Sequence, residues 1–312
     1  MKILVYGAGV IGSIYSARLH KAGFDITLLA RGKRYESLKR NGIVINDVLS
    51  RKRLVSKVPL TEILSSAIFY DLIIVTVRLD QLDSVKATLK SNAACQAIMF
   101  MLNNPDNLQQ LIQEFPDKKI LLGFPGVGGT CVNEQIDYVQ IKEQRTTIGD
   151  IEGTITNITE EMGKNFEHAG FKVDLCKNMQ AWLKTHAVFV VSVAAAISRE
   201  NGNSIQLGKN RNSVQRMVKS INEGFRSCER LGMPIAPANL KMIFMTMPQW
   251  FSVCYWQKAM KGKTGTLAMA PHANAAKAEM KLLAGKVLDI VHTSSVATPT
   301  LDNLLLNFIN SK

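Results

Sequence analysis

The sequence predicts an α/β domain built on a parallel sheet, followed by an all-α domain. A length of 312 residues suits two domains of ordinary size. Short apolar runs alternate with helical patterns through the first half, which is typical of βαβ units. Because strand patterns disappear from Met179 onward, we place the domain boundary after residue 178 and expect domains over 1–178 and 179–312.

In the first half, an apolar run over 2–6 ends at glycines and predicts a strand. Residues 10–22 have helical spacing, and 25–29 predict a second strand. A helix is expected over 158–169, and further strands are expected over 72–77, 97–102, 119–124, 138–141, 146–148 and 171–175. The second half predicts helices over 180–198, 213–231, 237–247 and 274–293.

Composition and cysteine usage favour the cytoplasm. The five cysteines are widely spaced without a C-x-x-C pair, which suits a reducing compartment and predicts neither a disulfide framework nor a metal site. The N-terminus resembles a short leader, but a first strand and glycine turn explain it better. The longest later apolar run, 187–197, is too short to span a bilayer and suits a buried helix, so we expect no membrane partner.

The chain is basic, with 38 Lys and Arg against 25 Asp and Glu and a net charge of +13. Such a charge favours anionic partners without choosing among them. No motif typical of DNA or RNA binding accompanies it, so no nucleic-acid partner is expected. Residues 31–57 hold nine Lys and Arg against two acidic residues, which concentrates charge after the second strand.

A G-x-G-x-x-G motif follows the first strand and opens the first helix: Gly7, Ala8, Gly9, Val10, Ile11 and Gly12. In this context the glycines allow a tight turn, a close approach to a pyrophosphate and close helix–strand packing. The motif therefore predicts a Rossmann-type doubly wound domain that binds a dinucleotide. The alternative is an ordinary glycine-rich turn between a strand and a helix.

The end of the second strand favours NADP over NAD. NAD sites have an acidic residue there for the ribose hydroxyls, whereas this chain has Ala30 and Arg31. A carboxylate would repel a 2′-phosphate, and Arg31 can pair with it. Arg78, after the strand predicted over 72–77, is a second candidate for this contact. The alternative is a solvated basic loop.

On these residues the sequence resembles the ketopantoate reductase (2-dehydropantoate 2-reductase) family over nearly its whole length. The resemblance is closest over 1–45 and continues through Asn103 in the M-L-N-N segment and Lys184 in A-W-L-K. It ends with Glu279, six residues before Gly285, and the closing segment over 296–301. It implies reduction of a 2-keto acid, most specifically ketopantoate to pantoate, by NADPH.

The resemblance also implies residue roles. Lys184 would act as the general acid, Glu279 would bind the substrate hydroxyl, and Asn103 would position cofactor and substrate. On the residues alone, Lys184 could instead extend to water from an apolar helix, and Glu279 could sit at the edge of a core stripe. The family resemblance is compatible with a homodimer, although the sequence does not determine the oligomeric state.

Two positions in the helix that carries Lys184 depart from the family pattern. Val188 and Ser192 stand where the family has asparagines, four and eight residues after the lysine. Ser192 retains a hydroxyl for a substrate contact, whereas Val188 does not. Two alternatives therefore stay open: a related reductase that acts on another keto acid or ketone, and an NADP-binding protein without turnover. Retention of both Lys184 and Glu279 argues against the second.

Overall fold

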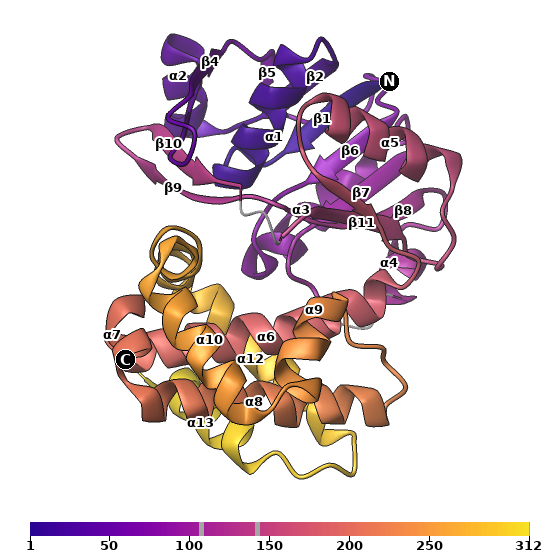
Figure 1. The fold of residues 1–312 in the computed structure, drawn as a ribbon. Helices are drawn as coiled ribbons and strands as arrows, with labels where there is room; N and C mark the ends of the chain where they lie inside the picture. Colours follow the sequence, from indigo (N-terminus) through magenta and orange to yellow (C-terminus); the bar gives the residue numbers. More distant parts are fainter. Residues whose placement is uncertain (106–108, 141–143, 312) are drawn as a thin grey trace. The chain divides into compact units, whose positions relative to one another are not determined.

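The computed structural model describes residues 1–105, 109–140 and 144–311. The chain divides into two compact units (Figure 1). Unit 1 comprises Met1–Leu102 and Asn107–Met179, and unit 2 comprises Asn103–Asp106 and Gln180–Lys312. The expected fold class, an α/β domain followed by a helical one, is confirmed.

The core of unit 1 is an eight-stranded sheet with the order β12-β11-β8-β7-β6-β1-β2-β5. All neighbouring pairs are parallel except β8 and β11, which are antiparallel. The strands are β1 (Lys2–Tyr6), β2 (Asp25–Leu29), β5 (Leu60–Thr61), β6 (Leu72–Val75), β7 (Ala97–Met101), β8 (Lys119–Phe124), β11 (Thr146–Asp150) and β12 (Val173–Leu175). Strands β6 and β7 are buried at every position, as expected for central strands of a parallel sheet.

The chain order reverses at β1, because β2 pairs with one of its edges and β6 with the other. Such a switch point opens a crevice at the carboxyl ends of the two diverging strands, where doubly wound folds bind ligands. The helical elements of unit 1 are α1 (Val10–Lys21), α2 (Gly32–Asn41), a 3₁₀ turn (Leu79–Gln81), α3 (Leu82–Ser91), α4 (Gln109–Glu114) and α5 (Asn157–His168).

A second, four-stranded sheet has the order β4-β3-β10-β9. Its strands are β3 (Ile43–Asp47), β4 (Arg53–Ser56), β9 (Gly128–Val132) and β10 (Gln135–Val139). Strand β10 pairs with β3 in parallel and with β9 in antiparallel orientation. The strand expected over 138–141 thus begins earlier than predicted, and its last position, Ile141, lies outside the described residues.

Unit 2 is helical throughout the part that the structure describes. Its elements are α6 (Met179–Arg199), α7 (Ser204–Lys209), α8 (Arg211–Arg230), α9 (Ala238–Lys241), a π-helical segment (Met242–Thr246), α10 (Gln249–Lys261), a second π-helical segment (Thr264–Met269), α11 (Ala270–Ala275), α12 (Lys277–His292) and α13 (Pro299–Asn310). Helix α8 packs against α10, α12 and α13, and α12 also packs against α13.

Helix α6 forms much of the core of unit 2. It is longer than the apolar run predicts, and by length and composition it could cross a membrane. However, 83% of its most apolar 18-residue window is buried inside the protein. Burial in the core therefore accounts for its hydrophobicity, as the sequence suggested for 187–197.

Two predicted helices differ clearly from the structure, and the basic segment after β2 is mostly helical. The helix expected over 237–247 is interrupted, since α9 gives way to a π-helical segment at Met242. The helix expected over 274–293 begins at Lys277, because residues 274 and 275 end α11. The basic loop after β2 is short, because α2 already begins at Gly32 and Arg31 is the residue preceding that helix.

Candidate cofactor site and catalytic residues

The glycine turn joins β1 to α1 in a conformation that requires glycine at two positions. Gly7 has a φ of 115°, a region that side chains rarely allow. A Cβ atom on Gly12 would lie 1.9 Å from the Gly7 carbonyl oxygen and 2.5 Å from Thr76 Oγ1. The first and third glycines of the motif therefore allow the turn and the close packing of α1.

Thr76, directly after β6, holds the turn in place. Its Oγ1 donates a hydrogen bond to the Gly7 carbonyl oxygen at 3.0 Å. This bond attaches the end of β6 to the glycine turn. The sequence analysis did not single out this residue. A hydroxyl residue just past a buried strand gives only a weak sequence signal, because its role depends on the pairing of β1 with β6.

Gly9 and the start of α1 leave room for an anion. A Cβ atom on Gly9 would have no neighbour within 4 Å, so this side of the turn is open. No side chain caps α1, and its first turn contains no acidic residue. The amino end of a helix carries unsatisfied N–H groups and a partial positive charge, so this end can receive a phosphate group.

A cavity of about 370 Å³ lies at the switch point next to the glycine turn. Its lining residues come from β1, the glycine turn, the β2–α2 connection, α2, the segment after β6, the 3₁₀ turn and α3: Tyr6, Gly7, Ala8, Leu29, Ala30, Arg31, Arg34, Val77, Gln81, Ser84 and Val85. Two of them are cationic and none is a carboxylate. The cavity therefore favours an anionic group.

The two arginines are held at this cavity by unit 1 itself. Arg31 donates a hydrogen bond to the Tyr6 hydroxyl, and its guanidinium lies 5.5 Å from the centre of the Tyr6 ring. Arg34 donates to the Ala8 carbonyl oxygen at 3.1 Å and to Ser13 Oγ at 3.3 Å. Arg31 is thus where the sequence predicts a cation, and Arg34 is a second one.

Arg78 follows Val77, which lines the cavity. Its guanidinium forms an ion pair with Asp80 at 3.1 Å, and it is not among the residues that line the cavity. The two residues are only two positions apart, so the pair is local. The structure therefore brings Arg31 together with Arg34 rather than with Arg78.

Lys184 lies in unit 2, in the first half of α6, and is half-buried. Burial raises the pKa of the Cys228 thiol on α8 to about 12, and the positive charge of Lys184 acts to lower this pKa. The next residue, Thr185, donates to the Ala236 carbonyl oxygen at 3.2 Å. This hydrogen bond fixes the Lys184 region of α6 against the segment that follows α8.

The two positions that depart from the family pattern are also on α6. A Cβ atom on Gly224 would lie 2.5 Å from Val188 Cγ1, so Val188 packs directly against the backbone of α8. Ser192 is completely buried, and its Oγ has no hydrogen-bond partner among the described residues. Val188 therefore serves the packing of two helices, and Ser192 is enclosed within the protein.

Glu279 lies in the first turn of α12 and is 5% exposed. A carboxylate is favourable near the amino end of a helix, because the helix dipole is positive there. Asn103, just after β7, is also buried and is grouped with unit 2. Unit 2 thus contains the three residues to which the family resemblance gives roles in the reaction, and unit 1 contains the glycine turn.

His186 is a titratable group that the sequence analysis missed. It lies two residues after Lys184, and its ring stacks on Trp182 with the ring centres 4.5 Å apart. Burial lowers the pKa of His186 to about 3, and the charge of His272 acts in the same direction. His186 is therefore neutral at physiological pH. A histidine inside an apolar helical run was the available signal.

Comparison with known proteins agrees with this description. The family model described as "Ketopantoate reductase PanE/ApbA" matches residues 3–153, which is most of unit 1. An uncharacterized oxidoreductase, YkpB of Bacillus subtilis, is 24% identical over 98% of this chain and 97% of its own length. A 2-dehydropantoate 2-reductase of Pyrococcus horikoshii is 23% identical over 80% of both chains.

Solved structures show the same fold over the whole chain. A 2-dehydropantoate 2-reductase from Geobacter metallireducens has a TM-score of 0.80 at 16% identity and covers 99% of both chains. A D-mandelate dehydrogenase, solved with NADH and anilino(oxo)acetate, has a TM-score of 0.77 at 17% identity. It covers 99% of this chain and 97% of its own.

Proposed function

The chain belongs to the ketopantoate reductase family through its N-terminal unit, and from this premise we propose that it reduces a 2-keto acid with NADPH. The family relatives make it an oxidoreductase. The observation that carries the proposal is the cavity beside the glycine turn, where Arg31 and Arg34 meet without a carboxylate.

The cavity and the start of α1 fit the two anionic parts of NADPH. The pyrophosphate would lie at the open side of Gly9, on the amino end of α1. The 2′-phosphate would pair with Arg31 and Arg34, since guanidinium groups bind phosphate oxygens through charge-assisted hydrogen bonds. When bound, NADPH supplies the hydride. The cavity lining contains no acidic residue that could hold the ribose hydroxyls of NAD.

Lys184 is the proposed proton donor. Hydride transfer to a ketone leaves negative charge on its oxygen, and a well-placed general acid contributes roughly 10²–10⁴-fold to the rate. The contacts of α6 with α8 hold the lysine on a rigid element. Glu279 would accept a hydrogen bond from a substrate hydroxyl, and Asn103 would position cofactor and substrate, as the family resemblance implies.

Ketopantoate is the first candidate substrate, and Val188 favours a second. An asparagine at this position would offer polar groups, whereas Val188 is buried against Gly224. Each polar contact that is lost with its partner left unpaired costs about 1–3 kcal/mol. A 2-keto acid with a more apolar substituent would avoid that cost. The D-mandelate dehydrogenase of the same fold was solved with anilino(oxo)acetate, which has an apolar ring.

Oxidation of NADPH by a panel of 2-keto acids, ketopantoate included, tests the reaction. Lys184→Ala is expected to lower kcat roughly 10²–10⁴-fold without a change in the Kd for NADPH. Lys209→Ala, which removes an exposed lysine of unit 2, is the control and is expected to keep full activity. Turnover of another keto acid but not of ketopantoate would select the second substrate. NADPH binding without any turnover would leave a non-catalytic NADP-binding protein.

The preference for NADPH is tested on the arginines of the cavity. Arg31→Ala is expected to weaken NADPH about tenfold or more and to change NADH little, because only NADPH has the 2′-phosphate. Arg40→Ala, an exposed change on α2, is the control, and Arg78→Ala measures whether that arginine contributes at all. Equal losses for NADPH and NADH in Arg31→Ala would contradict the proposed contact.

The five cysteines bear on the compartment. All five are free, and Cys131 and Cys254 are exposed. Exposed thiols persist in a reducing environment. The free thiols support our proposal that the enzyme acts in the cytoplasm on a small-molecule substrate.

A further inference from the structure

Unit 2 contains a second cavity, which the proposed reaction does not use. It measures about 570 Å³ and lies at the end of α6, the first half of α8 and the start of α13. We call it the α8–α13 groove. Its lining residues are Arg199, Asn212, Gln215, Arg216, Lys219, Pro299, Thr300, Asn303 and Leu304. Such a volume is within the usual range for small-molecule sites.

The lining of the α8–α13 groove is cationic. It contains Arg199, Arg216 and Lys219 and no acidic residue. Neither arginine has an ion pair or a side-chain hydrogen bond with any residue in the described part of the chain. Lys219 has only a long contact of 4.0 Å with Glu223 and remains 58% exposed. Three positive charges are therefore gathered in one cavity, and among the described residues Glu223 is the acidic partner of one of them, Lys219.

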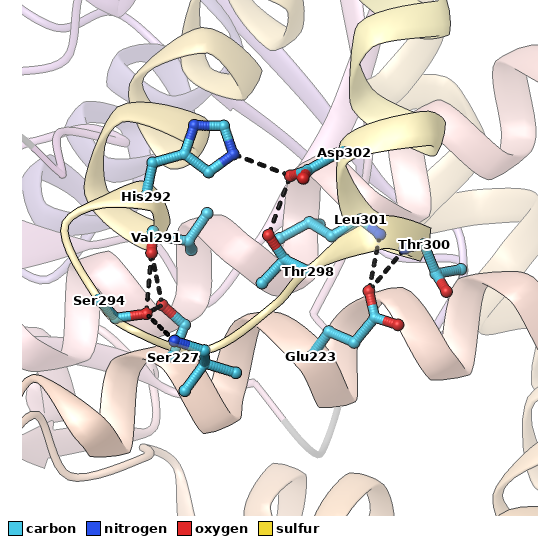
Figure 2. A network of polar contacts seen from close by, with 10 residues as sticks. Glu223, Ser227, Val291, His292, Ser294, Thr298, Thr300, Leu301 and Asp302 are labelled. Carbon is cyan, nitrogen blue, oxygen red and sulfur yellow. Dashed lines mark hydrogen bonds and ion pairs between the residues drawn. The ribbon is translucent and has the colours of Figure 1, made fainter.

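The carboxylate of Glu223, which contacts Lys219, also has backbone partners. Glu223 Oε2 accepts hydrogen bonds from the backbone N–H groups of Thr300, at 2.8 Å, and Leu301, at 3.0 Å, which closes the amino end of α13 (Figure 2). Pro299 at the start of that helix has no N–H group. An anion in the groove would therefore bind the side chains of the groove and not the end of α13.

The groove also gathers part of the positive charge of unit 2 that has no role in the proposed reaction. Residues 180–312 contain sixteen Lys and Arg against six Asp and Glu, an excess of ten positive charges. Among these, only Lys184 has a part in the proposed reaction. Arg199 follows Lys184 by fifteen residues on α6, which is about 22 Å along the helix axis, so the groove is a separate place.

We propose that the α8–α13 groove binds a small organic phosphate, either a monoester or a diphosphate. The planar guanidinium groups of Arg199 and Arg216 match phosphate oxygens in two-pronged hydrogen bonds. The amide side chains of Asn212, Gln215 and Asn303 provide donors and acceptors for the organic part. This inference concerns unit 2 alone and does not depend on the proposed reductase reaction.

Calorimetric titration of the full chain with pyrophosphate tests the proposal. Because pyrophosphate also suits the cofactor cavity, the titration is made on the Arg31→Ala protein as well as on the wild type. Binding is expected to persist in Arg31→Ala and to weaken about tenfold or more in Arg199→Ala and in Arg216→Ala. Arg226→Ala removes another exposed arginine of α8 outside the groove and is expected to bind normally.

Three results would overturn the proposal. The first is no binding of pyrophosphate beyond the binding that Arg31→Ala removes. The second is an equal loss in Arg226→Ala, which would reveal general attraction to a basic helix. The third is a protein that binds RNA, or vesicles with about 30% anionic lipid, but does not bind pyrophosphate. Circular dichroism of each variant confirms that a loss of binding is not a loss of fold.

Discussion

At the scale of single residues, the two outer glycines and the middle glycine of the turn have different roles. Gly12 faces the Gly7 carbonyl oxygen and the Thr76 hydroxyl at distances that leave no room for a Cβ atom. Gly9 faces open space and has an ordinary backbone conformation, with φ near −73°. Gly12 is therefore needed for the packing of the turn, whereas Gly9 leaves space for a ligand to approach the turn.

This difference predicts opposite effects of the same substitution. Gly12→Ala is expected to lower the free energy of unfolding by about 1–3 kcal/mol through overpacking, and NADPH binding with it. Gly9→Ala is expected to leave the thermal midpoint unchanged and to weaken NADPH about tenfold, because the methyl group occupies the space proposed for a phosphate. Thermal unfolding and cofactor titration of both variants check this. An unstable Gly9→Ala protein would contradict the assignment.

At the scale of elements, Gly224 allows α6 to approach α8 closely. A Cβ atom on Gly224 would lie 2.5 Å from Val188 Cγ1 and 3.3 Å from the side chain of Leu301 on α13. The two helices can approach closely only because Gly224 has no side chain. Val188, which stands where the family has an asparagine, therefore packs against a glycine that leaves room for it.

Gly224→Ala is expected to destabilise unit 2 by about 1–3 kcal/mol, because the new methyl group overlaps Val188. The double variant Val188→Ala/Gly224→Ala is expected to be more stable than the sum of its single effects predicts, since shortening the valine makes room. Gly285→Ala, in the interior of α12 with open space around it, is the control and is expected to be neutral or slightly stabilising. Additive effects of Val188→Ala and Gly224→Ala would show that the two residues do not compete for space.

The sequence predicts the elements whose patterns are local. The strands β1, β2 and β8 have the predicted bounds, because short apolar runs between glycines and polar residues define them. The four-stranded sheet was not predicted, because its pairing joins distant segments, as Ile45 with Ile136. The pairs β3–β4 and β9–β10 are local, but the pairing of β3 with β10, which joins them into one sheet, links segments about ninety residues apart that no local pattern reports.

The candidate site divides in the same way. The glycine turn and Arg31 follow from a motif and its position after a strand, so sequence alone was sufficient for both. The basic segment after the second strand left Lys33 and Arg34 open as further cofactor contacts beside Arg31, and Thr76 was not predicted at all, because its place depends on which strand lies beside β1. Arg78 pairs with Asp80 two residues away, a contact that competes with any other use of its charge.

At the scale of the whole molecule, a buried neutral histidine makes stability depend on pH. The unfolded chain protonates His186 near pH 6.5, whereas the folded protein keeps it neutral down to about pH 3. The unfolded state therefore gains a proton in this window, and stability falls as the pH falls from 6.5 towards 3. The slope from this group is at most about 1.4 kcal/mol per pH unit.

Urea unfolding at pH 7, 6 and 5 measures this slope. All three tryptophans, Trp182, Trp250 and Trp256, belong to unit 2, so their fluorescence follows the unit that contains His186. His186→Phe, which keeps an aromatic ring beside Trp182, is expected to have a smaller loss of stability on acidification. His168→Phe, an exposed change in unit 1, is expected to keep the wild-type slope. An unchanged slope in His186→Phe would assign the pH dependence to other groups.

The long apolar helix α6 has a consequence for how the protein is made. In the finished protein the helix is covered, in part by α8, whose Gly224 meets Val188. During synthesis, the residues of α8 leave the ribosome only after all of α6 has emerged. During that interval, the later helices of unit 2 cannot yet cover this 21-residue segment, whose hydropathy is that of a membrane span. Chaperones that bind apolar nascent segments therefore have a defined target in this chain, and it is the helix that carries Lys184.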